Sequence, residues 1–375
     1  MDSEFGDKNR YFIEAAAKTL DVLESFTDNT EQLSITEIAK RAKLPYTSAF
    51  RFVYTLAKRG YVTRAPGKRR YVLAPSRKRL RIGYAALGKI TFASEVTRSV
   101  VAAARQFGVA LIAADNEDNP SKALANAEQL LSEGIDVLIE HQRNEALSHV
   151  IAAKCHSANV PAIALNFPQP GAYYFGADSY KTGWLAGDYL LRFARKHSRG
   201  SAVTCLIIPS KGLGSTQNTR KVGLLDALGQ RARGWTAPEI EFAAPGVTAQ
   251  EGYTLTKRFI QKLVRRAPYL MVAAFSDPLA IGATRALREA GWQDRSVVVG
   301  QGGTAEGRRH ILRGGPLRAS VAYFPESYGM RVLKLAIKIC EGEHPPLVTH
   351  TDHVVLTTDN ISDFYPQKDE APLRE

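Results

Sequence analysis

Apolar residues recur every three or four positions in the first part of the chain, which predicts helices. The run from Tyr11 to Phe26 predicts one amphipathic helix, whose apolar positions are Ile13, Ala16, Ala17, Leu20, Leu23 and Phe26. A second short helix, ITEIAKRAK, follows either Ser34 or Thr36 as its N-cap.

A third helix and a hairpin complete this pattern. The helix is expected from about Tyr46 to Arg59, and Gly60 suits the position just after its end. Two alternating runs follow, YVTR and RYVL, joined by APGKR, and they predict a β-hairpin with a cationic tip. Three helices followed by a basic hairpin form an α+β winged helix-turn-helix.

From Leu80 onward, short continuous apolar runs alternate with helical patterns, first up to about residue 166 and again from about residue 201. This rhythm predicts α/β architecture in two lobes, each a doubly wound parallel sheet, with a ligand cleft at the carboxyl ends of the strands. The expected strands are LRIGYAA, VALIAAD, IDVLIEH, VPAIALN, SAVTCLIIPS, EIEFAAP, LMVAAFSD and SVVVG. The expected helices span Val96–Phe107, Ser121–Ser132, Glu145–Ala158, Gln217–Gln230, Ala249–Arg265 and Pro278–Ala290.

Positive charge is concentrated in one region. Residues 38–94 contain fifteen lysines and arginines and no aspartate or glutamate. Removing these fifteen charges from the net charge of +13 leaves a remainder of about −2, so the rest of the chain is nearly neutral. A basic surface that includes a helix-turn-helix favours double-stranded DNA as partner, whereas a charge run alone would only indicate a solvated face.

Cysteine usage and the N-terminus favour a cytoplasmic protein. Cys155, Cys205 and Cys340 are odd in number and widely spaced, which is typical of reduced thiols rather than of a disulfide framework. The start MDSEFGDKNRYF lacks the apolar core of an export signal, and no later segment reaches about 18 apolar residues in a row. Export and membrane spanning are therefore not expected.

The N-terminal region resembles the DNA-binding domain of IclR-type regulators through LSITEIAKRAKLPYTSAFRFVYTLAKRGYV. A helix of this size fits the major groove, where short hydroxyls and an arginine can bond base edges or phosphates. The hairpin would then contact the backbone or the minor groove. The expected DNA-binding residues are Thr47, Ser48, Arg51 and Tyr54 on the third helix, and Lys68, Arg69 and Arg70 on the hairpin.

The remainder resembles the type I periplasmic binding proteins, in particular the ribose-binding branch and the effector domains of LacI-type repressors. The matching stretches include GVALIAADNEDNPSKALANAEQLLSEGIDVLI, IPSKGLGSTQNTRKVG, FSDPLAIGATRALREAG and VVVGQGGTAEG. In that family the chain crosses between the lobes three times, here expected near Asp178, Tyr323 and Thr351. The expected domains are a head at 1–74, a linker at 75–79, an N lobe at about 80–178 and 324–351, a C lobe at about 179–323 and 352–366, and a tail at 367–375.

The family's ligand-binding positions can be matched one by one. They fall on Lys89, Phe92, Asn166, Arg220, Ser276, Asp277, Gly302 and Tyr323. The resemblance implies that Phe92 stacks on the apolar face of a sugar ring and that Arg220 bonds ring and hydroxyl oxygens. Asn166 and Gly302, however, stand where sugar-binding relatives place aspartates.

These departures bear on the ligand. Because carboxylates accept hydroxyl protons in pairs, losing both weakens the case for a neutral pentose or hexose. Lys89 and Arg220 without those acids would leave a cationic cleft. The expected effector is a small carbohydrate-like molecule, with a sugar acid or sugar phosphate as one alternative and an ordinary neutral polyol as the other.

Two other motifs are weak indications of a cofactor or metal site. Residues 300–305 fit G-x-G-x-x-A but lack an acidic residue about twenty positions later. His350 and His353 stand three apart in an extended run, so they point to different faces, and no further set of metal ligands is evident. No cofactor, metal site or catalytic residue is expected. The combination predicts a homodimeric, ligand-responsive regulator that is not an enzyme; the alternatives are a sugar kinase with a DNA-binding head and a transport-type sugar-binding protein.

Overall fold

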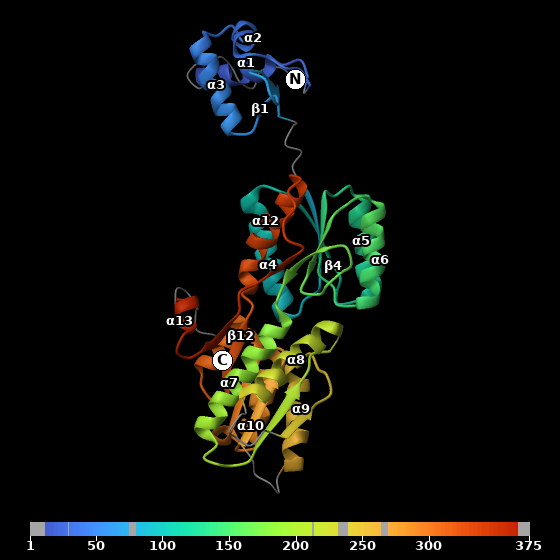
Figure 1. Ribbon diagram of the computed structural model, residues 1–375, viewed down its shortest axis with the longest axis vertical. Helices are drawn as coiled ribbons and strands as arrows, with labels where there is room; N and C mark the ends of the chain where they lie inside the picture. The colour runs from blue at the N-terminus through green and yellow to red at the C-terminus, as the bar shows by residue number, and fades with distance from the viewer. Residues whose placement is uncertain are drawn as a thin grey trace. The chain divides into compact units, whose positions relative to one another are not determined.

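The computed structural model describes residues 12–28, 30–74, 80–211, 214–231, 239–263 and 269–366. They divide into a compact head that ends at Leu80 and a larger sensor unit that begins at Arg81 (Figure 1). The expected linker at 75–79 and the expected tail at 367–375 lie outside the described residues. No helix in the described part of the chain is both long enough and apolar enough to cross a membrane.

The head is a winged helix-turn-helix. Ser34 is the N-cap of its second helix: its Oγ accepts the Glu37 N–H, and the Glu37 carboxylate accepts the Ser34 N–H, which settles the choice between Ser34 and Thr36. The hairpin strands are antiparallel, with Val62 opposite Leu73. The elements are α1 (Glu14–Glu24), α2 (Ile35–Arg41), α3 (Tyr46–Lys58), β1 (Val62–Arg64) and β2 (Tyr71–Leu73).

The apolar stripe expected for the first helix is buried only at its C-terminal end. Ile13 is 69% exposed and Leu20 is 56% exposed, whereas Val22 and Phe26 belong to the buried core of the head. Only the C-terminal end of α1 packs into that core, because the head is small and its core is completed by α2, α3 and the hairpin. The apolar spacing therefore predicted the helix but not which of its residues are buried.

The N lobe of the sensor unit is a six-stranded parallel sheet in the order β13-β7-β6-β5-β3-β4. Helices α4 and α12 lie on one face and α5 and α6 on the other (Figure 1). The strands are β3 (Arg81–Ala86), β4 (Ala110–Asp115), β5 (Val137–Glu140), β6 (Ala162–Leu165), β7 (Tyr173–Gly176) and β13 (Val348–His350). The helices are α4 (Thr91–Phe107), α5 (Pro120–Ser132), α6 (Glu145–Ser157) and α12 (Tyr328–Cys340).

The C lobe is a second six-stranded sheet, in the order β14-β12-β11-β10-β8-β9, parallel except for β14 against β12. Helices α7 and α8 pack on one face and α9 and α10 on the other. The strands are β8 (Val203–Ile208), β9 (Glu239–Phe242), β10 (Tyr269–Ala274), β11 (Ser296–Gly302), β12 (Leu317–Ala322) and β14 (Val354–Thr357). The helices are α7 (Ser179–His197), α8 (Gly214–Arg231), α9 (Ala249–Leu263), α10 (Asp277–Glu289), α11 (Ala305–Leu312) and α13 (Ile361–Phe364).

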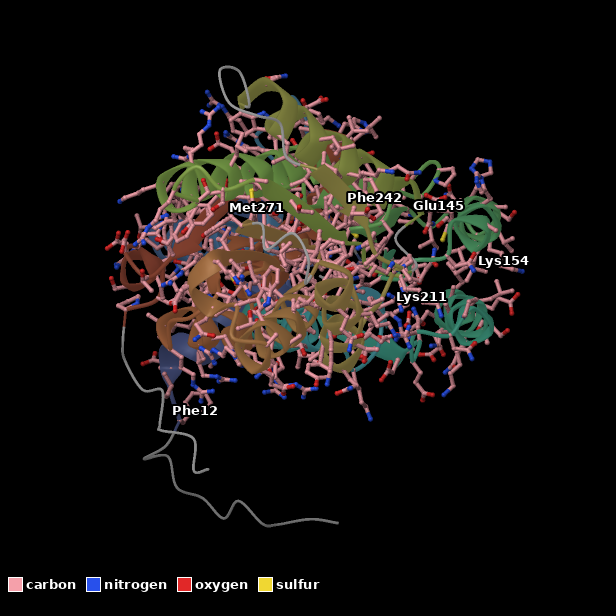
Figure 2. All side chains as sticks on the ribbon, turned by 90° about the horizontal axis from the view of Figure 1, so that it is seen from below. Phe12, Glu145, Lys154, Lys211, Phe242 and Met271 are labelled. Atoms are coloured by element: carbon pink, nitrogen blue, oxygen red, sulfur yellow. The ribbon has the colours of Figure 1, made fainter. Side chains whose placement is uncertain are left out.

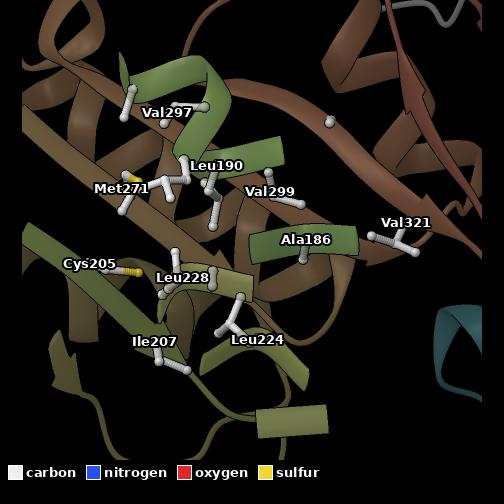
Figure 3. Close-up of a cluster of buried hydrophobic side chains, with 14 of the residues drawn as sticks. Ala186, Leu190, Cys205, Ile207, Leu224, Leu228, Met271, Val297, Val299 and Val321 are labelled. Carbon is white, nitrogen blue, oxygen red and sulfur yellow. The ribbon is translucent and has the colours of Figure 1, made fainter. Parts of the chain in front are cut away.

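The sequence pattern missed α7, and two of its residues explain why. Gly183 and Gly187 weaken the intrinsic helix propensity of this segment, yet they let α7 approach α8 closely. A Cβ at Gly183 would collide with the carbonyl oxygen of Arg220. Figure 3 shows the core that this contact completes, in which Leu190 and Leu224 pack against the sheet. The close helix pair fixes the backbone of Arg220.

Three segments connect the two sheets, and Asp178, Tyr323 and Thr351 lie in them. His353, in the third segment, accepts the Asp178 N–H at Nε2 at 2.9 Å, and its Nδ1 lies 3.3 Å from the carbonyl oxygen of Ala322. Since Nε2 is an acceptor here, the proton of the neutral ring sits on Nδ1 and is donated to Ala322. Burial lowers the pKa of His353 to about 4, so this bridge across the connecting segments is uncharged at neutral pH.

Candidate functional site

A cavity of about 430 Å3 lies between the lobes, at the carboxyl ends of strands from both sheets. The structure brings all eight residues expected to bind ligand into its wall. Asn166 and Tyr323 directly follow β6 and β12, and Gly302 is the last residue of β11, so these three lie where an open α/β sheet holds its ligands. The eight are Lys89, Phe92, Asn166, Arg220, Ser276, Asp277, Gly302 and Tyr323.

Arg220 is the buried cation of this cavity. Its side chain comes from α8, and the residue is only 6% exposed. Nη1 donates to the carbonyl oxygen of Phe275 at 3.2 Å, while Nε is buried without a hydrogen-bond partner. The guanidinium carbon lies 5.7 Å from the ring centre of Phe275 and 5.6 Å from that of Tyr323. These two rings hold the guanidinium in place without neutralising it.

Asp277 is fully buried and accepts three hydrogen bonds. Its Oδ1 accepts the Ser320 hydroxyl at 2.5 Å, and its Oδ2 accepts the Thr304 N–H at 2.7 Å and the Thr304 hydroxyl at 2.8 Å. Burial raises the pKa of Asp277 to about 6. The carboxyl group therefore fixes the loop before α11, and little of its accepting capacity is left for a ligand.

Asn166 presents a donor to the cavity. Its backbone φ of 60° is left-handed, a conformation that asparagine tolerates. Its Oδ1 accepts the Ala177 N–H at 3.3 Å and the Tyr328 hydroxyl at 2.8 Å. Because an N–H can only donate, the bond from Ala177 identifies this atom as the oxygen, and Nδ2 is left to donate to a ligand.

The aromatic part of the wall is a connected set. Phe92 meets Tyr323 edge to face at 5.9 Å between ring centres and Tyr328 at 5.8 Å. The expected helix start at Val96 is wrong, because α4 begins at Thr91 and places Phe92 in its first turn. Lys89 precedes that helix and is exposed, so it lies at the mouth of the cavity rather than in its interior.

Sequence reasoning missed several wall residues that offer further polar groups. His141 is buried and pairs with the ring of Phe167 at 6.1 Å, and burial lowers its pKa to about 3, so the imidazole is neutral. Ser210 Oγ and Gln301 Nε2 are buried without partners. The available signal was their position at strand ends: His141 directly follows β5, Ser210 comes two residues after β8, and Gln301 is the residue before the last one of β11. The missed residues also include Arg143, Thr216, Thr304 and Glu306.

The two lobes also touch through charged side chains. Arg143 of the N lobe forms an ion pair with Asp118 and donates to the carbonyl oxygen of Lys211 of the C lobe at 2.9 Å. Glu145 accepts the Ser215 N–H at 2.5 Å, so it caps the start of α8 from the opposite lobe; Glu145 and Lys211 are labelled in Figure 2. Hydrogen bonds from Ser215 hold the pKa of Glu145 below its ordinary value.

The head carries the second candidate site, on the solvent side of α3. Thr47, Arg51 and Tyr54 are exposed there, and Ser48 is half-buried. The sequence analysis overlooked Phe50, which is 45% exposed and stacks on Tyr54 with 6.5 Å between ring centres. Exposed aromatic side chains next to an arginine on a groove-sized helix can contact bases as well as phosphates.

The three cations of the hairpin differ in their surroundings. Arg70 forms an ion pair with Glu37 at 2.6 Å and donates to the carbonyl oxygen of Gln32, so it ties the hairpin to α2. Lys68 donates to the Gln32 side chain at 3.2 Å, and Arg69 is exposed. Lys68 and Arg69 are the cations of the hairpin tip best placed for a polyanion, whereas Arg70 has a structural partner within the head.

Among the described residues, no group of three or more histidine, cysteine, aspartate or glutamate side chains is arranged to hold a metal ion. Burial raises the pKa of the Cys205 thiol to about 12 and that of the Cys155 thiol to about 11, so neither is poised as a nucleophile.

Family comparisons match both parts of the chain. The family model described as "Periplasmic binding protein domain" matches residues 86–344, and the model described as "IclR helix-turn-helix domain" matches residues 15–66. The two matches fall within the sensor unit and the head, respectively.

Individual proteins match the sensor unit. The ribose import binding protein RbsB of Escherichia coli (strain K12) is 27% identical over 244 residues, which cover 64% of this chain and 77% of that protein. A solute binding protein of an ABC transporter from Mycobacterium smegmatis, solved with bound glycerol, aligns with a TM-score of 0.69 at 22% identity and covers 77% of this chain and 98% of its own. A second Mycobacterium smegmatis protein, solved with β-D-fucofuranose, gives a TM-score of 0.69 at 19% identity over 77% of this chain and 94% of its own.

Proposed function

Because the chain belongs to the periplasmic binding protein family and also carries an IclR helix-turn-helix domain, we propose that it is a ligand-responsive, DNA-binding transcription regulator. The observation that carries the proposal is the pairing of an exposed cationic helix-turn-helix with a ligand-sized cavity in one chain. In this proposal the head binds an operator, and the sensor unit binds a small-molecule effector.

The effector in this proposal is a carbohydrate-like molecule, either a neutral polyol or one that carries a carboxylate or a phosphate. Support comes from the matching proteins, which are described as importing ribose or as binding glycerol and β-D-fucofuranose. The cavity itself offers Phe92 for a sugar face and Arg220 with several hydroxyl and amide groups for its oxygens. A cavity of about 430 Å3 is of the size that small ligands occupy.

The proposal includes a homodimer in the cytoplasm. Helix-turn-helix proteins commonly read two half-sites about 34 Å apart, which requires two recognition helices. Ligand binding would favour one lobe arrangement, and the interlobe contacts of Arg143 and Glu145 are the protein's own contribution to that arrangement. A change in lobe arrangement would then alter how the two heads are presented to the operator.

Two other functions are less well supported. A sugar kinase would need a phosphate-binding loop, but residues 211–216 have the composition of such a loop in an order that does not fit the Walker A motif. A transport-type binding protein has no use for a DNA-binding head. We therefore propose a protein that binds its ligand without converting it.

Fluorescence anisotropy with a labelled fragment of the promoter upstream of the gene tests the regulator. We expect salt-sensitive binding whose affinity falls linearly with salt on a double-logarithmic plot. Absence of binding at low ionic strength, or ATP-dependent turnover of a sugar, would contradict the proposal.

A further inference from the structure

The interlobe cavity contains a cation that the protein does not neutralise. Arg220 is 6% exposed, its guanidinium makes one hydrogen bond, to the carbonyl oxygen of Phe275, and its Nε has no partner. No carboxylate of the described residues forms an ion pair with it. Burying an unpaired charge is costly, so this arrangement is relieved when a ligand supplies an anion.

The carboxylates of the cavity wall do not neutralise Arg220. Asp277 accepts hydrogen bonds from Ser320 and Thr304 on both oxygens, which hold its carboxylate against the loop before α11, and it forms no ion pair with Arg220. Glu306 is half-buried in the first turn of α11 and forms no ion pair with Arg220. It is the one remaining carboxylate among the described wall residues that can accept the hydroxyl protons of a ligand.

The backbone prevents a second acid at the usual position. Gly302 stands where sugar-binding relatives place an aspartate, and its φ of 124° is a conformation that side chains rarely adopt. A Cβ there would also lie 3.4 Å from Asp277 Oδ2, which would set a new carboxylate against a buried one. The backbone of this chain at Gly302 therefore disfavours an acid at this point.

The amides of the wall add donors rather than acceptors. Gln301 accepts the Tyr323 hydroxyl at Oε1 at 2.6 Å, which leaves its buried Nε2 as a donor without a partner. Tyr323 also packs on the Arg220 guanidinium, so this donor belongs to the same part of the wall. Asn166 offers its Nδ2 from the N lobe, because Ala177 and Tyr328 occupy its oxygen.

From this set we infer that the effector is a carbohydrate acid with a single carboxylate, which binds at Arg220 with Gln301 and Asn166 as further donors. The inference rests on the proposed sugar-sensing function and narrows it. A monoanion matches the one buried cation, whereas a dianionic phosphate would leave a charge unbalanced. The hydroxyls of Ser210 and Ser276 and the carboxylate of Glu306 then serve the hydroxyl groups of the sugar.

Matched probes test which ligand charge the cavity prefers. The thermal midpoint of the full chain is measured at constant ionic strength with glycerol, glycerate and glycerol 3-phosphate, and with the neutral, acid and phosphate forms of ribose, glucose and galactose. We expect the acids to stabilise the chain most, with at least about tenfold tighter binding than their neutral counterparts. A stronger effect of the neutral sugars or of the phosphates, or no effect of any probe, overturns the inference.

Two variants locate the carboxylate. Arg220→Met keeps the volume of the side chain but removes the charge, and we expect it to abolish the preference for acids. Asn166→Asp retains the oxygen that accepts from Ala177 and replaces the free donor by an acceptor, so we expect it to weaken acid binding at least about tenfold and to spare neutral sugars. Unchanged acid binding in either folded variant overturns the inference.

The proposed regulator is tested separately by the DNA-binding measurement. If acids bind but promoter affinity never responds to them, the function fails and the ligand assignment stands. If neutral sugars bind and change promoter affinity, the function stands and the ligand assignment fails.

Discussion

Arg51 of the head and Arg220 of the sensor unit carry the same guanidinium group in opposite surroundings. Arg51 is exposed on α3, where water and salt screen its charge and any phosphate can compete for it. Arg220 is buried between two aromatic rings with one hydrogen bond, so only a ligand that enters the cavity can reach it. Exposed cations supply affinity that depends on salt, whereas a buried unpaired cation supplies selectivity for one kind of ligand.

The largest expected effect comes from removing exposed cations of the head. In the triple variant Arg51→Ala, Lys68→Ala, Arg69→Ala we expect promoter affinity to fall about 10³-fold near physiological salt, and the logarithmic salt slope to become shallower by about 2 to 3. Anisotropy titrations at several salt concentrations measure both quantities.

A matched control removes three exposed cations from the sensor unit instead. Lys196, Lys262 and Lys334 lie on α7, α9 and α12 and are exposed. The triple alanine variant at these positions changes the net charge equally, so an equal loss of DNA binding would show that total charge, rather than the head, carries affinity.

The second effect concerns Arg220. We expect Arg220→Met to lose acid binding about 100-fold while its promoter affinity without ligand stays within about twofold of the unaltered chain, because a charged hydrogen bond of about 1.5–3 kcal/mol is removed only from the cavity. Calorimetry measures the affinity for the acid, and fluorescence anisotropy measures the affinity for the promoter. A parallel loss of both activities would mean that the substitution disturbs the fold.

The third effect is a pH dependence centred on His353. Its pKa is lowered to about 4 in the folded chain, so between that value and the ordinary 6.5 the unfolded chain binds the extra proton. The contribution of the neutral His353 to the free energy of unfolding is therefore present above pH 6.5 and is lost as pH falls towards 4. We expect a loss of about 1 to 2 kcal/mol between about pH 7 and pH 5 relative to His353→Gln, whose amide can keep both hydrogen bonds. Denaturant titrations that give identical pH slopes for both proteins would refute the role of His353.

The smallest effect concerns base reading by Phe50. An exposed aromatic ring on α3 can contact the methyl group of thymine, and burial of one methyl contributes about 0.8 kcal/mol, or roughly fourfold in affinity. Replacing thymine by uracil one position at a time in the operator should weaken binding by that factor at one position or more. Phe50→Ala should be insensitive to the same replacements; equal sensitivity would exclude Phe50 as the reader.

The sequence predicted much of this architecture because its signals are local. Continuous apolar runs predicted eight of the twelve described strands of the two sheets, but not β7, β12, β13 and β14. All eight ligand positions lie in one cavity, to which strand ends and the helices α4 and α8 contribute. The helix α7 escaped prediction because Gly183 and Gly187 serve the packing of two helices, a feature that appears only when both are in place. Local patterns therefore predict elements better than contacts between them.

The state of each side chain was also beyond the sequence. The amino-acid sequence did not show that both carboxylate oxygens of Asp277 accept hydrogen bonds. Nor did it show that Arg220 lacks a counter-charge or that Arg70 forms an ion pair with Glu37. These facts depend on which groups face each other after folding. They decide the chemistry of the cavity more than its composition does.

The central claim is that occupancy of the interlobe cavity controls the DNA-binding head. Its most direct test is promoter affinity of the full chain with and without a saturating amount of the acid that stabilises it most, repeated with Arg220→Met. The account predicts a change of at least about tenfold in the unaltered chain and none in the variant. An acid that binds to saturation in the cavity and leaves promoter affinity unchanged would contradict it.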